Sequence, residues 1–208
     1  MRKSLMAGIG AIAGIFMGAA CILGAEEMKA GTTIENLQSA YGGESSAKAR
    51  YEAFAAKADE EGCKSVAALF RATSESEGIH ATKHAAAIKK LGAEPRADVR
   101  KADVKTTKEN LEAALKGETA EKDSMYPAFI KQAESDKDSA AVKTFKGAMA
   151  AEIEHAKLYK QALNELDSWK AAGKEFLVCT VCGWTTMDSA TKKCPVCASP
   201  RSKFDAIK

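Results

Sequence analysis

The chain contains an internal repeat, and this repeat constrains the possible folds more than any other feature. Residues 33–54 (TIENLQSAYGGESSAKARYEAF) align with residues 107–129 (TKENLEAALKGETAEKDSMYPAF). The alignment pairs Glu44 with Glu118 and Tyr51 with Tyr126, so the second copy has one extra residue between these positions. With only four prolines, the chain has few places that would interrupt long helices. A duplicated helical hairpin of this kind predicts a four-helix bundle.

Local signals indicate where the helices of this bundle begin and end. Thr32 and Thr106 each stand three residues before a glutamate, the spacing of a capping box, so the first and third helices are expected to start there. The four helices are expected over residues 32–61, 64–91, 106–134 and 137–172. The extra residue between Glu118 and Tyr126 predicts a one-turn π-bulge, and Pro127 just after it predicts a kink.

The repeat also preserves metal-binding residue types. Each half supplies a glutamate from its first helix and a Glu-x-x-His pair from its second, namely Glu44, Glu77, His80, Glu118, Glu152 and His155. Residues three apart share a helix face, and this arrangement over four helices is the ligand pattern of carboxylate-bridged diiron sites. A single such pair on an alanine-rich helix is usually a solvated face. Two pairs at a constant offset, which use two of only three histidines, predict a diiron site instead.

Glu121 breaks the symmetry of the repeat. It lies three residues after the ligand glutamate of its helix, whereas the corresponding position in the first half is Ala47. We expect Glu121 to be a seventh ligand, the alternative being one more surface glutamate. His84 follows His80 by one turn and has Tyr159 as its repeat counterpart. It is expected to lie behind the ligands or at the surface.

Four cysteines near the C-terminus have the spacing of a second metal site. Two C-x-x-C pairs separated by eleven residues provide Cys179, Cys182, Cys194 and Cys197. Four thiolates can surround one ion tetrahedrally, and both iron and zinc accept this geometry, with disulfide pairing as the alternative. Val178, Trp184 and Phe204 offer only a small apolar shell, so the metal is expected to supply much of the folding energy. Cys63 stands alone and is expected to be a packing residue.

The N-terminal segment, residues 1–25, resembles a targeting sequence. Arg2 and Lys3 precede an apolar run over residues 5–20, about the length of a signal-peptide core and short for a membrane span. The small residues before Cys21 resemble a lipoprotein cleavage site, and cleavage after Ala25 or retention as an uncleaved anchor are alternatives. We therefore expect an exported, periplasmic or membrane-associated bacterial protein rather than a cytoplasmic one with a helical extension.

These signals divide the chain into three parts. Residues 1–25 are the targeting segment or anchor, residues 26–172 the helical bundle, and residues 174–208 the cysteine domain. The formal net charge is only +3, and no basic stripe stands out along the chain. Nucleic acid is therefore not expected as a partner.

Together the two metal-binding patterns resemble the rubrerythrin family. The similarity runs from Thr32 to Lys208 and rests on NLQSAYGGES, EEG, ESEGIHA, NLEAALKGETAEKDSMYPAF, AEIEHAKLY and CTVCGW…CPVCASPRSKF. It implies an all-α ferritin-like four-helix bundle with a small C-terminal rubredoxin-like metal-binding domain. The diiron ligands that the resemblance implies are Glu44, Glu77, His80, Glu118, Glu121, Glu152 and His155.

The resemblance also implies a peroxidase activity. In the family a diferrous centre reduces hydrogen peroxide to water, and electrons return one at a time through the four-cysteine iron. The residue matching Glu121 binds one iron when oxidised, and the one matching His80 replaces it on reduction. Residues matching Tyr51 and Tyr126 lie by the diiron site. Members form head-to-tail homodimers, in which one subunit's rubredoxin domain lies near the other's diiron site.

Two other functions stay open on sequence alone. An iron-handling protein that oxidises ferrous iron, as ferritins do, would use the same bundle, although storage needs no electron inlet of the kind the cysteine tail suggests. A non-enzymatic module with structural zinc in the cysteine site would leave the bundle ligands unexplained. The redox protein that donates electrons is also open, because a cytoplasmic NAD(P)H reductase could not reach an exported protein.

Overall fold

The computed structural model describes residues 30–171 and 173–208. The predicted targeting segment, residues 1–25, lies outside the described residues. Within the described part, no helix combines the length and the apolar character needed to cross a bilayer.

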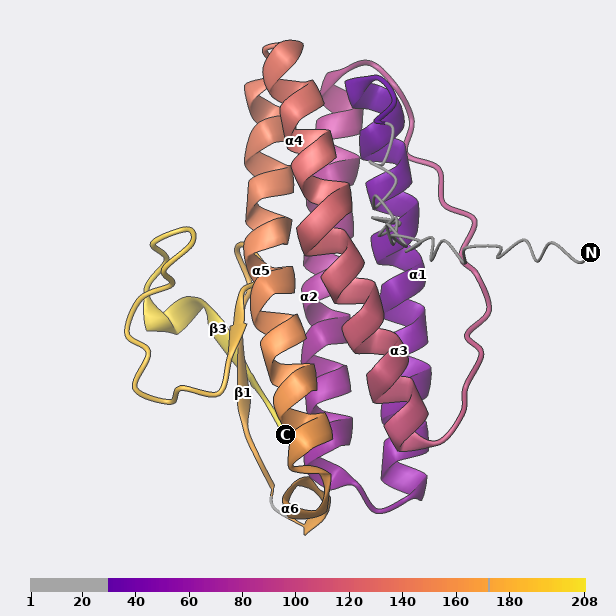
Figure 1. The fold of residues 1–208 in the computed structure, drawn as a ribbon. Coiled ribbons are helices and arrows are strands. Elements are labelled where there is room, and N and C mark those ends of the chain that lie inside the picture. Colours follow the sequence, from indigo (N-terminus) through magenta and orange to yellow (C-terminus); the bar gives the residue numbers. More distant parts are fainter. Residues whose placement is uncertain (1–29, 172) are drawn as a thin grey trace, which may run out of the picture.

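Long helices run side by side in an elongated bundle, with a small β-domain against one flank (Figure 1). The bundle elements are α1 (Thr33–Glu60), α2 (Lys64–Lys90), α3 (Thr107–Ala120), η1 (Glu121–Met125), α4 (Tyr126–Ser135) and α5 (Ser139–Asn164). The capping boxes at Thr32 and Thr106 are confirmed. Each threonine side chain accepts the backbone N–H of the glutamate three residues on, whose carboxylate accepts the threonine's own N–H. The predicted helical hairpins are therefore present.

The extra residue of the second half is absorbed as a turn of π-helix. This turn, η1, joins α3 and α4 without interrupting the helical segment, as the change of offset in the repeat predicts. Pro127 lies in the first turn of α4, where its lack of an N–H is tolerated. The π-helical turn thus begins just after the ligand glutamate Glu118 of α3.

The prediction of the last helix is wrong in its C-terminal part. A continuous helix over residues 137–172 was expected, but α5 ends at Asn164 and a separate short helix, α6 (Leu166–Ala171), follows. Glu165 leaves the helical conformation with φ −120° and ψ 25°. Trp169, which is fully buried, donates through its indole N–H to the Glu165 carboxylate at 3.3 Å. Burial of this large ring in the bundle core outweighs the local helix propensity.

The C-terminal domain is a three-stranded antiparallel sheet with the order β2-β1-β3. Its elements are β1 (Phe176–Cys179), β2 (Thr185–Thr186), the short 3₁₀ turn η2 (Arg201–Lys203) and β3 (Phe204–Ile207). Side chains alternate along β1, as in any strand. Phe176 and Val178 join the apolar core of the bundle, whereas Leu177 and Cys179 face the domain's own small cluster. Val178 is therefore not part of the predicted shell around the cysteines, and Leu177 takes that place.

Two apolar clusters lie on either side of a polar centre in the bundle. One cluster contains Tyr51, Phe54, Phe70 and Tyr159, and the other contains Tyr126, Phe129 and Phe145. The hydroxyls of Tyr51 and Tyr126, one from each cluster, donate to carboxylates between them. Each fully buried large apolar side chain contributes about 1.5–3 kcal/mol. The clusters thereby hold the polar centre in place.

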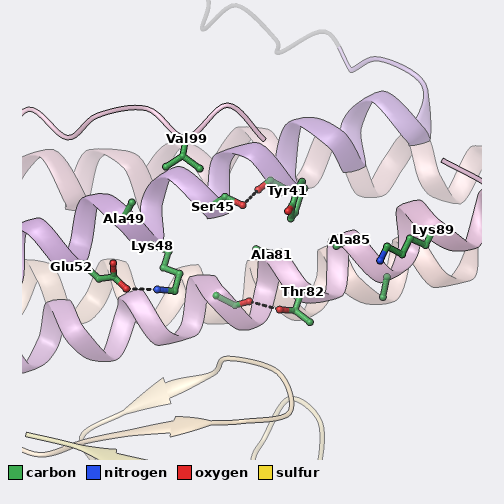
Figure 2. A pocket seen from close by; sticks show the side chains of 12 residues that line it. Tyr41, Ser45, Lys48, Ala49, Glu52, Ala81, Thr82, Ala85, Lys89 and Val99 are labelled. Carbon is green, nitrogen blue, oxygen red and sulfur yellow. Dashed lines mark hydrogen bonds and ion pairs between the residues drawn. The ribbon is translucent and has the colours of Figure 1, made fainter. Parts of the chain in front are cut away.

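An open cavity of about 700 Å³ lies on the outer face of α1 and α2 (Figure 2). Its lining includes the ion pair of Lys48 with Glu52, and Ser45 and Thr82 donate to carbonyls of their own helices. Val99, from the connection between α2 and α3, also lines it. No predicted metal-binding residue of the described chain lies there, so this cavity is separate from the chemistry described below.

Candidate metal centres

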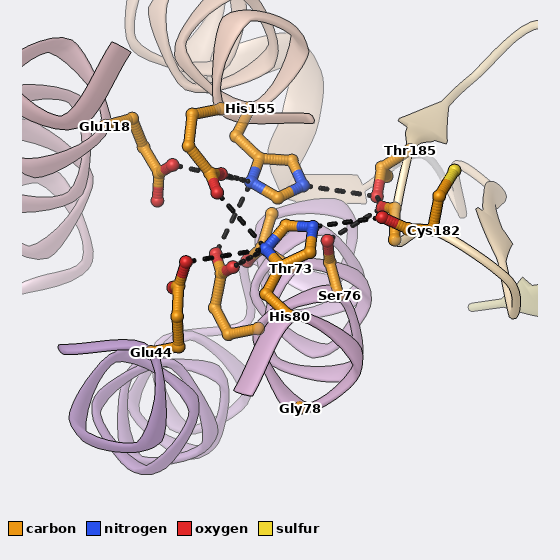
Figure 3. Close-up of polar contacts among 12 residues, drawn as sticks. Glu44, Thr73, Ser76, Gly78, His80, Glu118, His155, Cys182 and Thr185 are labelled. Atoms are coloured by element: carbon orange, nitrogen blue, oxygen red, sulfur yellow. Dashed lines mark hydrogen bonds and ion pairs between the residues drawn. The ribbon is translucent and has the colours of Figure 1, made fainter. Parts of the chain in front are cut away.

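Six of the seven predicted bundle ligands converge at the polar centre. Their donor atoms form two groups, and within each group the atoms lie within 4.8 Å of one another. The first group is Glu44, Glu77, His80 and Glu152, and the second is Glu77, Glu118, Glu152 and His155. Figure 3 shows Glu44, Glu118 and the two imidazoles pointing toward one another from different helices. All six residues are buried.

Glu77 and Glu152 belong to both groups and lie between them. One oxygen of Glu77 is 2.9 Å from Nδ1 of His80, and its other oxygen is 3.4 Å from Nδ1 of His155. The two oxygens of Glu152 lie 3.1 Å from His80 and 2.8 Å from His155. A carboxylate that faces two neighbouring positions with its two oxygens is suited to bridge two ions. With two ions bound, Glu77 and Glu152 would bridge them, and the terminal ligands Glu44 and Glu118 would each hold one ion, a distinction that the repeat did not make.

Buried polar atoms without a hydrogen-bond partner gather at this centre. Within the described residues they include Glu44 Oε2, Glu77 Oε1, Glu118 Oε2, both oxygens of Glu152 and Nδ1 of His155. Each unsatisfied buried polar atom costs about 1–3 kcal/mol, and charged groups cost more. Two divalent cations would satisfy these atoms and balance the charge of four carboxylates. The residues therefore fit a dinuclear metal centre.

The protonation of the metal-free site reflects the crowding of like charges. Burial, followed by repulsion from Glu77 and Glu152, raises the pKa of Glu44 well above its ordinary value. Burial and the same two neighbours raise the pKa of Glu118 to about 8. Burial alone would raise the pKa of Glu152, but His80 and His155 hold it below its ordinary value. Bound cations would replace the protons that these carboxylates otherwise hold.

The cysteine domain holds both ligand histidines in one tautomer. Nε2 of His80 lies 3.1 Å from the Cys182 carbonyl oxygen, which can only accept, so Nε2 carries the proton. Nε2 of His155 lies 3.2 Å from Oγ1 of Thr185, whose own proton is donated to the Gly183 carbonyl. With metal bound, both imidazoles would donate through Nε2 and offer an unprotonated Nδ1 to the metal positions.

The two predicted tyrosines lie beside the terminal carboxylates. Tyr51 donates its hydroxyl hydrogen to Glu118, and Tyr126 donates to Glu44. Burial, followed by the charge of Glu118, raises the pKa of Tyr51 well above its ordinary value, and burial with Glu44 does the same for the pKa of Tyr126. Both phenols therefore keep their protons, and each stabilises one terminal carboxylate as an acceptor.

Glu121 lies outside both donor groups. It is the first residue of η1, is partly exposed, and lines a cavity of about 970 Å³ together with Gly43, Arg50 and Met125. Burial, followed by repulsion from Glu44, raises the pKa of Glu121 well above its ordinary value. Glu121 follows the terminal ligand Glu118 by three residues along the same helical segment. The predicted seventh ligand therefore stands beside the centre, at a cavity also lined by exposed residues of the α2–α3 connection.

The four cysteine sulfurs form a compact cluster with free thiols. Sγ of Cys179 lies 3.6 Å from that of Cys197, and Sγ of Cys182 lies 3.5 Å from that of Cys194. A disulfide would require about 2.05 Å. Metal–sulfur bonds of about 2.3 Å in a tetrahedron give sulfur–sulfur edges of about 3.8 Å. The cluster therefore matches a four-thiolate metal site rather than the disulfide alternative.

Several functional contacts at the centre have no sequence signal. Ser76 donates to the Gly183 carbonyl at 2.7 Å, and Thr185 contacts His155, yet neither residue was predicted as a site residue. His84 is completely buried, so the expectation that it lies behind the ligands is met and its surface alternative is not. Burial, followed by repulsion from His80, lowers the pKa of His84 to about 3, so its imidazole is neutral.

Comparisons with known proteins agree with this architecture. The family model described as Rubrerythrin matches residues 35–163, and that of the rubrerythrin rubredoxin-like domain matches residues 178–205. Nigerythrin from Nitratidesulfovibrio vulgaris is 36% identical over 179 residues, which cover 85% of this chain and 87% of that protein. Rubrerythrin-2 from Clostridium acetobutylicum is 35% identical over 184 residues, covering 86% and 99%.

A solved structure gives the same result. The fully reduced, all-ferrous state of nigerythrin matches this structure with a TM-score of 0.81 at 34% identity, covering 88% of this chain and 91% of the other. Fold and site together define a diiron protein with a ferritin-like bundle and a rubredoxin-like domain. The chain belongs to the rubrerythrin family. The predicted fold class, the diiron site and the four-cysteine site are thereby confirmed.

Proposed function

We propose that this protein is a peroxidase that reduces hydrogen peroxide to water at the diiron site and receives electrons through the four-cysteine iron. Membership of the family makes it an oxidoreductase with these two metal sites. The peroxide substrate and the direction of electron flow are the finer statement made here. The way the two sites are joined in the folded chain supports the direction of electron flow, and the resemblance to the rubrerythrin family supports the peroxide substrate.

The observation that carries the proposal is the contact between the two ligand sets. The carbonyl of Cys182, a predicted thiolate ligand, accepts a hydrogen bond from His80, a predicted diiron ligand, at 3.1 Å. A single hydrogen bond therefore separates a residue of one site from a residue of the other. A protein that only oxidises and stores iron has no use for an electron inlet at this point. The contact favours delivery of electrons to the diiron centre.

The chemistry divides between the metal and the chain. When bound, two ferrous ions supply the two electrons that cleavage of the peroxide O–O bond requires. The residues of the chain supply what the metal does not. Glu77 and Glu152 fix the spacing of the two positions, Tyr51 and Tyr126 keep protons beside the terminal carboxylates, and Glu121 stands at the cavity beside them.

The placement of Glu121 and His80 supports a ligand exchange during the cycle. With His80 inside the donor group and Glu121 outside it, four carboxylates balance two divalent cations. Two ferric ions would carry two more positive charges, and a fifth carboxylate from Glu121 would offset part of that excess. We therefore propose that Glu121 binds in the oxidised state and that His80 takes its place on reduction.

The test is a stopped-flow comparison of peroxide and dioxygen as oxidants of the anaerobically reduced, metal-quantified full chain. Peroxide is expected to react faster. Equal or slower reaction with peroxide would contradict the peroxidase proposal. Continued oxidation of added ferrous iron by dioxygen, well beyond two ions per chain, would identify the iron-oxidising alternative instead.

Two further predictions stay proposals. Export, with lipid attachment through Cys21, cleavage after Ala25 or retention as an uncleaved anchor, concerns residues outside the described part. Mass determination of the mature N-terminus tests it. In the head-to-tail homodimer, the cysteine domain of one chain would lie against the diiron site of the other. Here the cysteine domain lies against the diiron site of its own chain. Analytical ultracentrifugation of the metal-loaded protein tests the dimer. If the protein is exported, its electron donor would be an exported redox protein as well.

A further inference from the structure

His84 is a buried histidine that the metal ligand set does not use. Its Nδ1 lies 3.2 Å from Oγ1 of Thr144, and its Nε2 lies 3.2 Å from the hydroxyl oxygen of Tyr126. Tyr126 in turn donates to Glu44, a terminal carboxylate of the diiron site. These four side chains form one unbroken series of hydrogen bonds that starts on α5, crosses α2 and α4, and ends at the metal site.

The two ends of this series lie in different surroundings. His84 and Tyr126 are completely buried, and Glu44 is 1% exposed. Thr144 is 8% exposed and lines a groove of about 750 Å³ between α2, α5 and the cysteine domain. The series is therefore a connection between the protein surface and the diiron site through an interior that is otherwise apolar.

The hydrogen bonds of this series have one consistent direction. A metal-bound Glu44 is a carboxylate and can only accept, so Tyr126 gives its proton to Glu44 and must itself accept from Nε2 of His84. A neutral imidazole carries one proton, so Nδ1 is unprotonated and accepts from the Thr144 hydroxyl. Every donor in the series thus points toward the metal site, as a path for inward proton movement requires.

The other half of the bundle lacks this connection. Tyr159 occupies the position equivalent to His84, and its hydroxyl lies 2.5 Å from that of Thr73. Within the described residues, no hydrogen bond joins Tyr159 to Tyr51, which is the equivalent of Tyr126. The repeat preserves the ligands but not this feature, so the symmetry of the fold does not explain His84.

We propose that Thr144, His84 and Tyr126 form a proton path from the groove to Glu44. The proposal rests on the proposed function, since reduction of one peroxide to two water molecules consumes two protons with its two electrons. For each proton, solvent protonates the Thr144 oxygen as its hydrogen moves to Nδ1. The Nε2 hydrogen moves to Tyr126, and the phenolic hydrogen moves to Glu44 and then to a peroxide oxygen. Each group gains and loses one proton, so none changes charge.

The location of the groove fits this role. Cys182 and Cys197 of the four-thiolate site line the same groove as Thr144. Protons would therefore enter beside the point where electrons enter, and each electron that crosses to the diiron site would be accompanied by a proton from the same side. His84 must regain its Nε2–H tautomer before a second proton passes, so the path delivers protons one at a time.

The first test reads the direction of the hydrogen bonds without any turnover. The full chain, labelled with ¹⁵N-histidine and loaded with diamagnetic zinc, is examined by NMR, with His84→Gln used to assign the resonances. His84 is expected to be neutral, with a protonated Nε2 and a hydrogen-bonded, unprotonated Nδ1. A proton on Nδ1, or a charged imidazolium, would overturn the proposed direction.

The second test measures proton delivery in the iron-loaded protein. Glutamine can keep both hydrogen bonds of His84 but cannot exchange protons as imidazole does, and Thr144→Val removes the entry hydroxyl at nearly constant volume. Both variants are expected to lower the rate of oxidation by peroxide by about 10- to 100-fold and to enlarge the solvent deuterium isotope effect. Tyr159→Phe, which removes a buried hydroxyl at the equivalent position, is the matched control and should retain the wild-type rate.

The outcomes separate this inference from the function on which it rests. Wild-type rates in both variants, with iron content unchanged, would overturn the proton path. A wild-type protein that does not prefer peroxide would contradict the peroxidase proposal only. Reduction of dioxygen also consumes protons. In that case the oxidation rates and solvent isotope effects of the same variants are measured with dioxygen, and they test the proton path. If His84→Gln does not fold, Thr144→Val decides.

Discussion

Gly183 of the cysteine domain lies against His80 of the diiron site so closely that no other residue fits. A Cβ atom at this position would come within 2.4 Å of His80 Nε2 and 2.7 Å of Ser76 Oγ. The backbone of Gly183 also has φ +85°, a conformation that side chains disfavour. The two domains therefore dock through a position where both space and backbone geometry require glycine.

Gly183→Ala is expected to separate the two metal sites. The added methyl group must displace either His80 or the cysteine domain, so reduction of the diiron centre through the four-cysteine iron should slow by about tenfold or more, since second-layer contacts of ligand histidines have effects of this size. Stopped-flow reduction, monitored at both sites, measures this rate. Gly147→Ala, where a Cβ atom meets nothing within 4 Å, is the control. Unchanged electron transfer in Gly183→Ala would refute the role of this contact.

The metal-free protein is expected to lose stability as the pH rises from 5 to 8. The pKa of Glu118 is about 8 in the folded chain against an ordinary value of 4.5, and the pKa of Glu44 is also raised. The unfolded chain therefore releases these protons at lower pH than the folded one. Burial opposes the charged form of His80 and His155, but their carboxylate neighbours outweigh it and raise the pKa of both, which adds to the same loss.

Glu118 alone should lower the free energy of unfolding of the metal-free protein by about 3 kcal/mol over this interval. Urea unfolding at four pH values measures it. The lowered pKa of Glu152 has the opposite effect only below its ordinary value of 4.5, outside the interval. The pKa of His84, lowered to about 3, opposes the fall within the interval by about 2 kcal/mol, which is less than the contribution of Glu118. Metal-loaded protein is the control, because cations replace the protons, and its stability should not fall. A metal-free protein that becomes more stable toward pH 8 would disprove this account of the site.

Glu121→Ala is expected to impair oxidation by peroxide more than oxidation by dioxygen. If Glu121 binds iron only in the oxidised state, its loss should leave the reduced site intact and slow the peroxide reaction by about 10- to 100-fold. Rapid mixing of the reduced variant with each oxidant measures the two rates. Asp123→Ala changes an exposed carboxylate in the same π-helical turn and should have no effect. An unaltered peroxide rate in Glu121→Ala would leave the ligand exchange without support.

Cys194→Ser is expected to remove one metal site and spare the other. Cys194 is buried among the four thiolates, and its loss should abolish the visible absorption of a ferric-thiolate centre. Iron analysis should still find two ions per chain in the bundle. Cys63→Ser, which changes a buried cysteine outside the metal ligand groups, should keep the full spectrum. Zinc rather than iron in the purified cysteine site would remove the electron inlet from the proposed function.

Much of the diiron site could be predicted from the sequence because its determinants are local. Glu77 and His80 share a helix face through their spacing of three, and Glu152 and His155 repeat it. The π-helical turn was likewise predictable, since an insertion of one residue within a continuous helix has few other solutions. These features depend on periodicity, which the sequence displays directly.

The docking of the two domains could not be predicted in this way. The hydrogen bond from Ser76 to the Gly183 carbonyl joins residues 107 positions apart. Nothing in the sequence around either residue indicates that the two are neighbours. The break at Glu165 depends on where Trp169 is buried, and the role of His84 depends on Thr144 in another helix. Such contacts are set by tertiary packing, and local sequence patterns do not indicate which distant residues will meet.

The alternation along β1 has a consequence for how the protein is made. Phe176 and Val178 are buried in the same apolar cluster as Phe70 of α2, yet they emerge from the ribosome long after that helix. Until then the nascent bundle exposes an apolar face to water, with the hazard of association that such surfaces bring. Synthesis of the last residues closes this face, so a chain truncated before β1 would be aggregation-prone as well as lacking one metal site.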